Sequence, residues 1–420
     1  MKRLFINIAK LVQTGEMAGK KPLRGAEMSV LKMLEDAYLL TDNDKISSFG
    51  KMSEIREKLS EYQNGDTEII DLTGKMVLPA FCDSHTHLVY AGSREQEFID
   101  KMKGLSYKEI AKRGGGILNS ARLLHETSEE ELFRQTLVRA KEIMGFGTGA
   151  VEIKSGYGLN TADEIKMLRV ARRVGQETPL TVKTTYLGAH AVPERYAGNR
   201  EGYVDEIVKE TIPAIAAEGL ADFTDVFTED GFFSVADTEK IFEAALRFGM
   251  TPKVHANQMS RSGGVQAGVK YGAISVDHLE STAEEEFRLL ANSNTIATLL
   301  PGSTLFLEMD YAPAREMIDH GVPVAIASNY NPGSSPSGDV RFMTFLAVLK
   351  MKMTPEEVLN AITVNGAHAM GLGSTHGSIV AGKQASFIIT KEIPSLAWIP
   401  YAFTSPWIDQ LYLNGERILL

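Results

Sequence analysis

Two histidines separated by one residue, His85 and His87, are the first feature of the sequence that suggests chemistry. They follow an apolar, strand-like run, and side chains two positions apart on an extended chain point the same way. Two imidazoles at the end of one strand can therefore bind a single metal ion. The same spacing also occurs in ordinary cores and on surfaces, so this pair alone leaves both interpretations open.

Three further histidines favour the metal interpretation. His190, His255 and His278 each lie at or just after the end of a separate strand-like run. Five histidines thus come from four strand ends, and the active sites of (β/α)8 barrels are built at that edge. The remaining histidines lie in helix-like or loop-like contexts and are interpreted as solvated or locally hydrogen-bonded: His125, His320, His368 and His376.

Eight short apolar runs predict strands that are covered on both faces. They are Met76–Phe81, Ala150–Lys154, Val182–Leu187, Phe223–Phe227, Pro252–His255, Ile274–Asp277, Thr295–Leu300 and Val324–Ser328. Helix-like segments alternate with them, which predicts an α/β fold with a closed (β/α)8 barrel. A doubly wound open sheet would alternate in the same way, but the count of eight and the positions of the histidines favour the barrel.

Helix starts are indicated by capping boxes, in which a hydroxyl and an acid three residues later satisfy each other's backbone amides. The pairs are Thr127 with Glu130, Thr161 with Glu164, and Thr354 with Glu357, the last with a proline in the first turn.

The two ends of the chain show short alternating segments rather than the strand–helix pattern. Residues 1–75 contain four such segments and residues 377–420 contain three, with turns at Asn43-Asp44 and Asn414-Gly415. We therefore expect a small β-sandwich built from both ends, beside a metal-dependent hydrolase barrel over residues 76–376.

Composition restricts the class of protein. The 420 residues are 44% hydrophobic and 23% charged, as in soluble globular proteins, and the net charge of −10 argues against nucleic acid as a partner. The single cysteine, Cys82, excludes an intrachain disulfide and favours a reducing compartment. No apolar run approaches the ~18–20 residues of a membrane span, and no signal peptide is evident. A cytoplasmic enzyme acting on a small molecule is expected.

Longer motifs carry a family resemblance. The segment Cys82–His87 resembles the first-strand metal motif of the metal-dependent amidohydrolase superfamily, and further stretches, in order along nearly the whole chain, are similar to the imidazolonepropionase family. These are HTHLVYAGSR (85–94), GGGI (114–117), EIKSGYGL (152–159), YLGAHAVP (186–193), KVHANQ (253–258), DHLE (277–280) and NPGS (331–334). The HxH pair is shared by many hydrolases and deaminases, whereas EIKSGYGL and LGAHAVP are far more specific.

The resemblance implies a cofactor and a set of ligands. The family holds one Zn or Fe ion with residues that match His85, His87, His255 and Asn329. It implies that His278 shuttles protons and orients the attacking water.

The resemblance also implies a substrate, 4-imidazolone-5-propanoate, whose ring would be opened by hydrolysis to N-formimino-L-glutamate in histidine degradation. Arg94 matches the partner of the substrate's carboxylate tail. The other positions that match substrate contacts are Tyr107, Tyr157, His190, Gln258, Asn331, Gly333 and Ser334. A homodimer is a further implication of the resemblance.

One position departs from the family pattern. Asn329 stands where the family has an aspartate that binds the metal and accepts a proton. An amide oxygen can coordinate a metal but is neutral and not a base. Two explanations remain open: an inactivated enzyme, or one in which His278 is the base. Another cyclic amidohydrolase or deaminase, or a non-catalytic binding protein on this scaffold, are the alternatives. No P-loop or strand-linked GxGxxG motif supports nucleotide binding.

Overall fold

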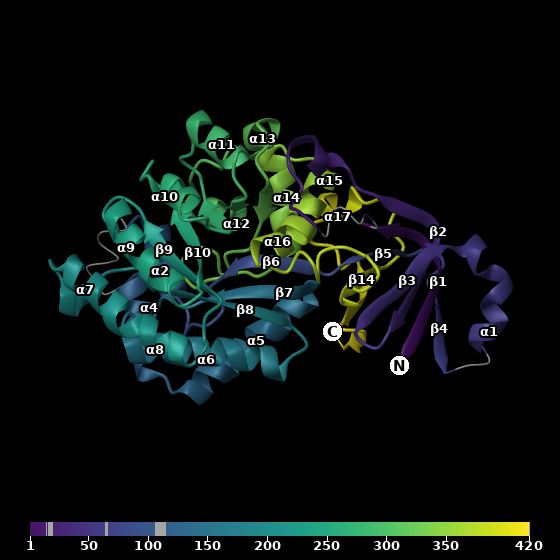
Figure 1. Ribbon diagram of the computed structural model, residues 1–420, viewed down its shortest axis with the longest axis horizontal. Helices are drawn as coiled ribbons and strands as arrows, with labels where there is room; N and C mark the ends of the chain where they lie inside the picture. Colours follow the sequence, from purple (N-terminus) through teal and green to yellow (C-terminus); the bar gives the residue numbers. More distant parts are fainter. Residues whose placement is uncertain (14, 16–19, 64–65, 106–114, 420) are drawn as a thin grey trace.

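The computed structural model describes residues 1–13, 15, 20–63, 66–105 and 115–419. They form two sheets of eight strands each, one parallel and one mixed. In Figure 1 the parallel sheet and its helices occupy the left and centre of the molecule, and the mixed sheet, with both chain ends, lies to the right.

The parallel sheet is a nearly closed barrel in which the strands follow one another in chain order. Where the first and last strands meet, the backbone amides of Asn329 and His87 donate to the carbonyls of His85 and Tyr330, at 3.0 and 2.9 Å. The barrel strands are β6 (Phe81–Thr86), β7 (Thr148–Lys154), β8 (Thr181–Ala189), β9 (Phe223–Thr228), β10 (Thr251–Ala256), β11 (Ser275–His278), β12 (Ile296–Leu299) and β13 (Val324–Ile326). The predicted (β/α)8 fold is confirmed.

Helices connect successive strands and cover the outside of the barrel (Figure 1). The described helices are α1 (Leu59–Gln63), α2 (Glu95–Met102), α4 (Ile117–Glu126), α5 (Glu129–Gly145), α6 (Thr161–Glu177), α7 (Arg200–Glu206), α8 (Ile212–Ala217), α9 (Val235–Leu246), α10 (Gly264–Lys270), α11 (Glu284–Ala291), α12 (Pro301–Leu307), α13 (Ala314–Asp319), α14 (Val340–Met351), α15 (Pro355–Asn360), α16 (Gly366–Ala369) and α17 (Trp398–Tyr401).

Both chain ends contribute to the mixed sheet, as the sequence predicts. Its strands are β1 (Lys2–Val12), β2 (Met33–Asp42), β3 (Lys45–Lys51), β4 (Thr67–Asp71), β5 (Met76–Pro79), β14 (Phe387–Thr390), β15 (Ile408–Leu413) and β16 (Glu416–Ile418). They form one hydrogen-bonded path, β16-β15-β14-β5-β1-β2-β3, with β4 also paired to β1. The predicted turns at Asn43 and Asn414 are present, and both asparagines have a positive φ of 51°.

The structure corrects the predicted first barrel strand and two predicted caps. Residues 76–81 do not form one strand, because β5 pairs with β1 and β14 of the mixed sheet and only Phe81 onward belongs to the barrel. The caps of α5 and α6 are Ser128 and Asn160, each one residue away from the predicted threonine. The box at Thr354 and Glu357 is confirmed.

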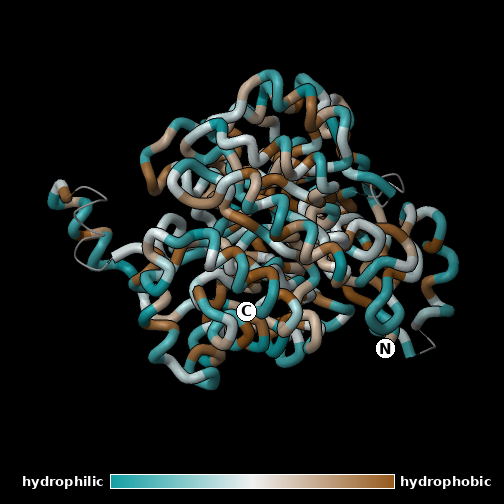
Figure 2. Tube along the Cα trace, turned by 60° about the vertical axis from the view of Figure 1, so that its left-hand side comes forward, coloured by the Kyte–Doolittle hydropathy of each residue, from teal (hydrophilic) through white to brown (hydrophobic). Residues whose placement is uncertain are grey.

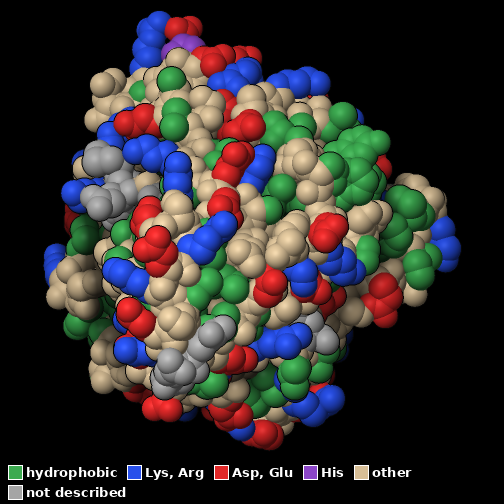
Figure 3. Space-filling model, turned by 90° about the vertical axis from the view of Figure 1, so that its right-hand side faces the viewer, with side chains coloured by type: hydrophobic (Ala, Val, Ile, Leu, Met, Phe, Trp, Pro, Cys, Tyr) green, Lys and Arg blue, Asp and Glu red, His purple; other side chains and the backbone are tan. Residues whose placement is uncertain are grey.

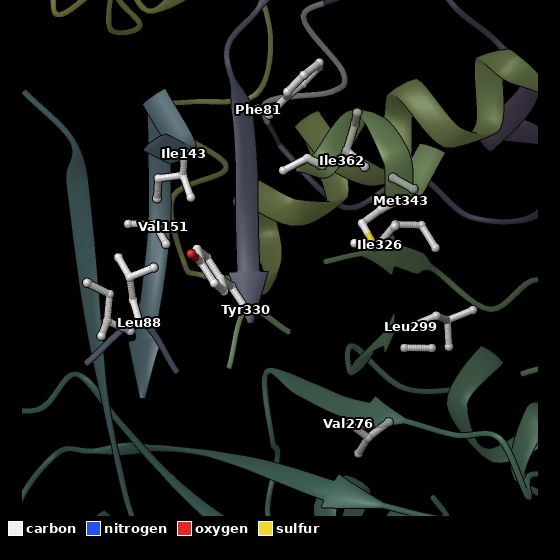
Figure 4. Close-up of a cluster of buried hydrophobic side chains, with 14 of the residues drawn as sticks. Phe81, Leu88, Ile143, Val151, Val276, Leu299, Ile326, Tyr330, Met343 and Ile362 are labelled. Atoms are coloured by element: carbon white, nitrogen blue, oxygen red, sulfur yellow. The ribbon is translucent and has the colours of Figure 1, made fainter. Parts of the chain in front are cut away.

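The barrel and the mixed sheet each contain a cluster of buried hydrophobic side chains. Side chains from the barrel strands and the covering helices form the largest cluster, which includes Val151, Leu299 and Met343 (Figure 4). A separate cluster around Phe5 and Phe387 is formed mainly by side chains from the strands of the mixed sheet. Hydrophilic stretches dominate the outer loops (Figure 2). Burial of apolar surface stabilises a folded protein by roughly 25 cal/mol per Å², and this packing holds the barrel strands and their ends in position.

The face that carries the mixed sheet shows acidic and basic side chains interspersed (Figure 3). Among the helices of the described residues, none is long and apolar enough to cross a membrane.

Candidate metal centre and active site

The carboxyl ends of the barrel strands bring the five predicted histidines together. The ring centroid of His85 lies 5.3 Å from that of His87, 4.5 Å from that of His255 and 5.7 Å from that of His278. His190 stacks on His87 with 5.2 Å between centroids. All five side chains are buried. The prediction that these residues meet at one edge is therefore confirmed, whereas their individual roles stay predictions.

Three residues at or beside the histidine centre have an unusual backbone geometry. His278, Leu279 and Asn329 have positive φ values of 86°, 73° and 53°. A positive φ is costly for residues other than glycine, and asparagine tolerates it best. Such conformations persist where the surrounding structure holds them, and they concentrate at functional sites.

Two buried aspartates contact the histidines from behind. Nδ1 of His85 lies 2.6 Å from Oδ2 of Asp277, and Nδ1 of His255 lies 3.0 Å from Oδ2 of Asp225. The second contact is close, although Nδ1 of His255 is without a well-aligned hydrogen bond among the described residues. Since a carboxylate accepts, it favours the proton on Nδ1 and leaves the lone pair on Nε2. Within the described residues, Nε2 of both rings is buried without a hydrogen-bond partner.

Burial favours the neutral form of four of the five imidazoles. Burial lowers the pKa of His85 and His87 well below its usual value, and neighbouring cationic groups add to the effect. Burial lowers the pKa of His190 to about 3. It also lowers the pKa of His255, although Asp225 opposes this shift. A neutral imidazole is the form that binds a metal ion.

The donor atoms fit a metal ion. Ligand atoms of His85, His255 and His278 lie within 4.8 Å of one another. Oδ1 of Asn329 is buried and has no hydrogen-bond partner in the part of the chain that the structure describes. His87 stands beside this group rather than within that distance. Unpartnered buried nitrogen and oxygen atoms are costly unless a ligand satisfies them, so the arrangement fits Zn or another divalent ion.

A cavity of about 370 Å³ opens onto the histidines. Apolar side chains, among them Phe227, Phe232 and Met259, form much of its wall. The predicted substrate residues that line it are Arg94, Tyr157, His190, Gln258, Asn331, Gly333 and Ser334. Tyr107 lies outside the described residues. The cavity has the size and the mixture of apolar wall and few polar groups that suit a small molecule.

Arg94 enters the cavity at the start of α2 and is held by Glu97. Its Nε and Nη2 donate to Oε2 of Glu97 at 2.9 and 2.6 Å. A Cβ on Gly333 would lie 2.1 Å from Nη1 of Arg94, so a larger residue at this position would displace the guanidinium. Glu97 also accepts from the backbone amide of Gly116 at 3.1 Å. Sequence reasoning did not find Glu97, although its spacing three residues after Arg94 on a helix was available as a signal.

Asn331 organises the loop after β13. Its Oδ1 accepts from the backbone amides of Gly333 and Ser334, both at 2.8 Å. Its Nδ2 donates to the carbonyl of Asn329 at 2.6 Å. The last of these bonds ties the loop to the backbone of Asn329.

Other predicted contacts lie deeper. Tyr157 is buried, and burial raises its pKa. Nδ1 of His190 lies 3.0 Å from the carbonyl oxygen of Gly156. That contact orients the ring with Nε2 away from the backbone.

A cluster of buried charges below the histidines was missed by sequence reasoning. Lys154 contacts Glu152, Asp225 and Asp277, and Lys253 contacts Glu152. All five side chains are fully buried. Burial alone would lower the pKa of Lys154, but the three carboxylates raise it. The signal in the sequence was the presence of charged residues inside otherwise apolar strands.

Comparisons with known proteins agree with this architecture. Residues 76–418 match the model of the amidohydrolase family. The match covers the barrel and its histidine centre, and it makes the chain a member of this class of hydrolases.

Proteins of similar sequence identify the family within this class of hydrolases. A protein named imidazolonepropionase from Flavobacterium johnsoniae is 50% identical, with 99% of each chain covered. One of the same name from Christiangramia forsetii is 50% identical, with 100% of each chain covered. The chain therefore belongs to the imidazolonepropionases of the amidohydrolase family.

Solved structures share the fold. A triazine hydrolase variant aligns with a TM-score of 0.76 at 16% identity, covering 99% of this chain and 94% of its own. Guanine deaminase from E. coli aligns at 0.74 and 13% identity, covering 100% and 99%. An atrazine chlorohydrolase from Arthrobacter aurescens, complexed with zinc, aligns at 0.72 and 15% identity, covering 99% and 94%.

Proposed function

We propose that this protein hydrolyses the cyclic amide of 4-imidazolone-5-propanoate to N-formimino-L-glutamate, a step of histidine degradation. The observation that carries the proposal is the position of Arg94 at the wall of the cavity that opens onto the histidines. A cation there pairs with a carboxylate tail while the ring reaches the centre. The full-length identity to two imidazolonepropionases supports the same substrate.

We propose His85, His87, His255 and Asn329 as the ligands of one divalent ion, Zn or Fe. The ion, when bound, supplies Lewis acidity that lowers the pKa of water and polarises the amide carbonyl. The chain's own residues supply position and proton transfer. His278 lies beside His255, with 5.2 Å between ring centroids, and in this proposal it orients the attacking water and shuttles protons. A ring nitrogen of His278 also lies within 4.8 Å of the ligand atoms of His85 and His255, so this side chain would be placed to hold the ion as well.

The cavity residues hold the substrate. Gln258 carries both a donor and an acceptor, which suits the ring nitrogens and carbonyl. Tyr157 stays protonated because burial raises its pKa, so it donates a hydrogen bond. Ser334 extends the same wall. The apolar wall excludes water from the ring and strengthens the polar contacts made to it.

In this proposal, Asn329 limits the rate of hydrolysis. Its Oδ1 can bind an ion but cannot take a proton, and a positioned acid–base group typically contributes about 10²–10⁴-fold. We therefore propose slow turnover and weaker metal binding than an aspartate would give. The unpartnered, buried Oδ1 in the described structure supports a coordinating role for this atom.

The test compares the native protein with Asn329→Asp, each with its metal content measured. Faster hydrolysis by the variant, by about 10²–10⁴-fold, is the expected result. Comparable rates would make His278 the base and remove the role given to residue 329. No hydrolysis by either protein with metal bound would refute the proposed substrate.

Asn329 also favours a second candidate, a protein that binds the ligand without turning it over. Tight binding of the imidazolone together with no hydrolysis at saturating metal would support this candidate. Ring substrates with and without a propanoate tail separate both from another cyclic amidohydrolase or deaminase, which would not require the tail.

A further inference from the structure

Lys154 of β7 points into the barrel and reaches carboxylates on two other strands. Its Nζ donates to Oε1 of Glu152 at 2.5 Å and to Oδ2 of Asp225 at 2.8 Å, and it lies 3.6 Å from Oδ2 of Asp277. All four side chains are fully buried. Buried carboxylates are costly unless they are paired, so this cation stabilises an arrangement that the apolar barrel would otherwise disfavour.

The same two aspartates face metal-binding imidazoles. Oδ2 of Asp277 lies 2.6 Å from Nδ1 of His85, and Oδ2 of Asp225 lies 3.0 Å from Nδ1 of His255. In each aspartate, one oxygen therefore contacts both Lys154 and a histidine. The ammonium group of Lys154 is thus linked through one aspartate to the ring of His85 and through another to the ring of His255.

We propose that Lys154 is a positioning residue of the metal centre. It fixes the Oδ2 atoms of Asp225 and Asp277, and through them it sets the ring orientation of His255 and His85. This inference rests on the proposed metal site. Groups that orient metal ligands in this way typically contribute about 10- to 100-fold to metal affinity.

Lys253 provides a matched control. It is as deeply buried as Lys154 and also pairs with Glu152. Its other hydrogen bonds go to the carbonyls of Ser84 and Ala369, both at 3.2 Å. Within the described residues, its ion pairs and hydrogen bonds do not reach Asp225 or Asp277.

The sign of the effect separates positioning from simple electrostatics. Removing a positive charge close to a divalent cation reduces repulsion, so Coulomb's law alone predicts tighter metal binding. Loss of positioning predicts weaker binding, because the two imidazoles lose their fixed orientation.

The experiment measures zinc dissociation constants of the native protein, Lys154→Met and Lys253→Met by competition with a chelator. The unfolding free energy of each zinc-free protein is measured alongside. We expect both variants to lose stability, but only Lys154→Met to bind zinc about 10- to 100-fold more weakly. The visible spectrum of the cobalt-loaded protein, which reports ligand geometry, should change in Lys154→Met and not in Lys253→Met.

A double variant guards against loss of folding. Lys154→Met with Glu152→Gln removes one buried cation and one buried carboxylate together, so the native excess of one carboxylate in the cluster is preserved. Positioning predicts the same weakened zinc binding in this protein. Unchanged or tighter binding in the Lys154 variants, or an equal loss in Lys253→Met, would overturn the inference. A native protein that binds no zinc would instead overturn the metal site itself, and this inference with it.

Discussion

Replacing Arg94 with glutamine should weaken the binding of ligands that carry a carboxylate tail and leave tail-free ligands almost unaffected. Nε and Nη2 of Arg94 already donate to Glu97, at 2.9 and 2.6 Å. Nη1 passes beside Gly333 at the cavity wall. Glu97 thus occupies the Nε–Nη2 edge of the guanidinium, and the Nη1–Nη2 edge keeps N–H groups that can donate to the tail.

The magnitude is worked for one charge-assisted hydrogen bond between this edge and the tail. A hydrogen bond to a charged group is worth about 1.5–3 kcal/mol, which corresponds to a loss of about 10- to 150-fold in affinity. The side chain of Arg94 is 13% exposed, so screening by solvent reduces this value only modestly.

The assay is calorimetric titration of the zinc-loaded protein with imidazole-4-propanoate and with 4-propylimidazole. Neither ligand is hydrolysed, so the result does not depend on turnover. The difference between the two ligands isolates the tail, as in a double-mutant cycle. Arg94→Lys is the control, because it keeps the charge and should lose less. An equal loss for both ligands in Arg94→Gln would refute a tail-binding role and indicate that Arg94 supports the loop through Glu97.

Three further predictions follow from the same structure. Gly333→Ala should displace the guanidinium of Arg94, whose Nη1 would lie 2.1 Å from the new Cβ, and the calorimetric tail preference should shrink as in Arg94→Gln. Burial, aided by Lys383, lowers the pKa of His376 to about 4. The stability linked to this depressed pKa is present above the unfolded value of about 6.5 and is lost as the pH falls toward 4, by about 3 kcal/mol. His376→Gln should therefore flatten the unfolding free energy across that range in denaturant titrations, and an unchanged slope would contradict the assignment. Removing the metal with a chelator should lower the melting temperature, since a ligand at about 1,000 times its Kd stabilises by about 4 kcal/mol, and an identical melting curve would contradict a native metal site.

The general plan of the molecule could be predicted from the sequence because it depends on repeated, local signals. Seven of the eight apolar runs are barrel strands in the structure. The histidines could be grouped because parallel strands place their carboxyl ends on one rim. The proline and the acid after Thr354 gave a complete helix start.

What could not be predicted depends on contacts between distant residues. The run that begins at Met76 reads as one strand, and only pairing with β14, far along the chain, assigns its first half to the mixed sheet. Asp225 carries no local sign that it faces His255, since the two lie on neighbouring strands.

The position of strand β5 means that one of its two edges is paired only late in synthesis. It lies between β1 and β14 in the mixed sheet, and one residue separates it from β6, which carries His85. Synthesis runs from the N-terminus, so all eight barrel strands are made before β14, the strand that pairs with β5. Until then the edge of β5 that β14 covers has no partner, and unpaired edges promote aggregation. Truncations that remove β14 to β16 should thus reduce the yield of folded protein, although none of the residues they delete lines the cavity.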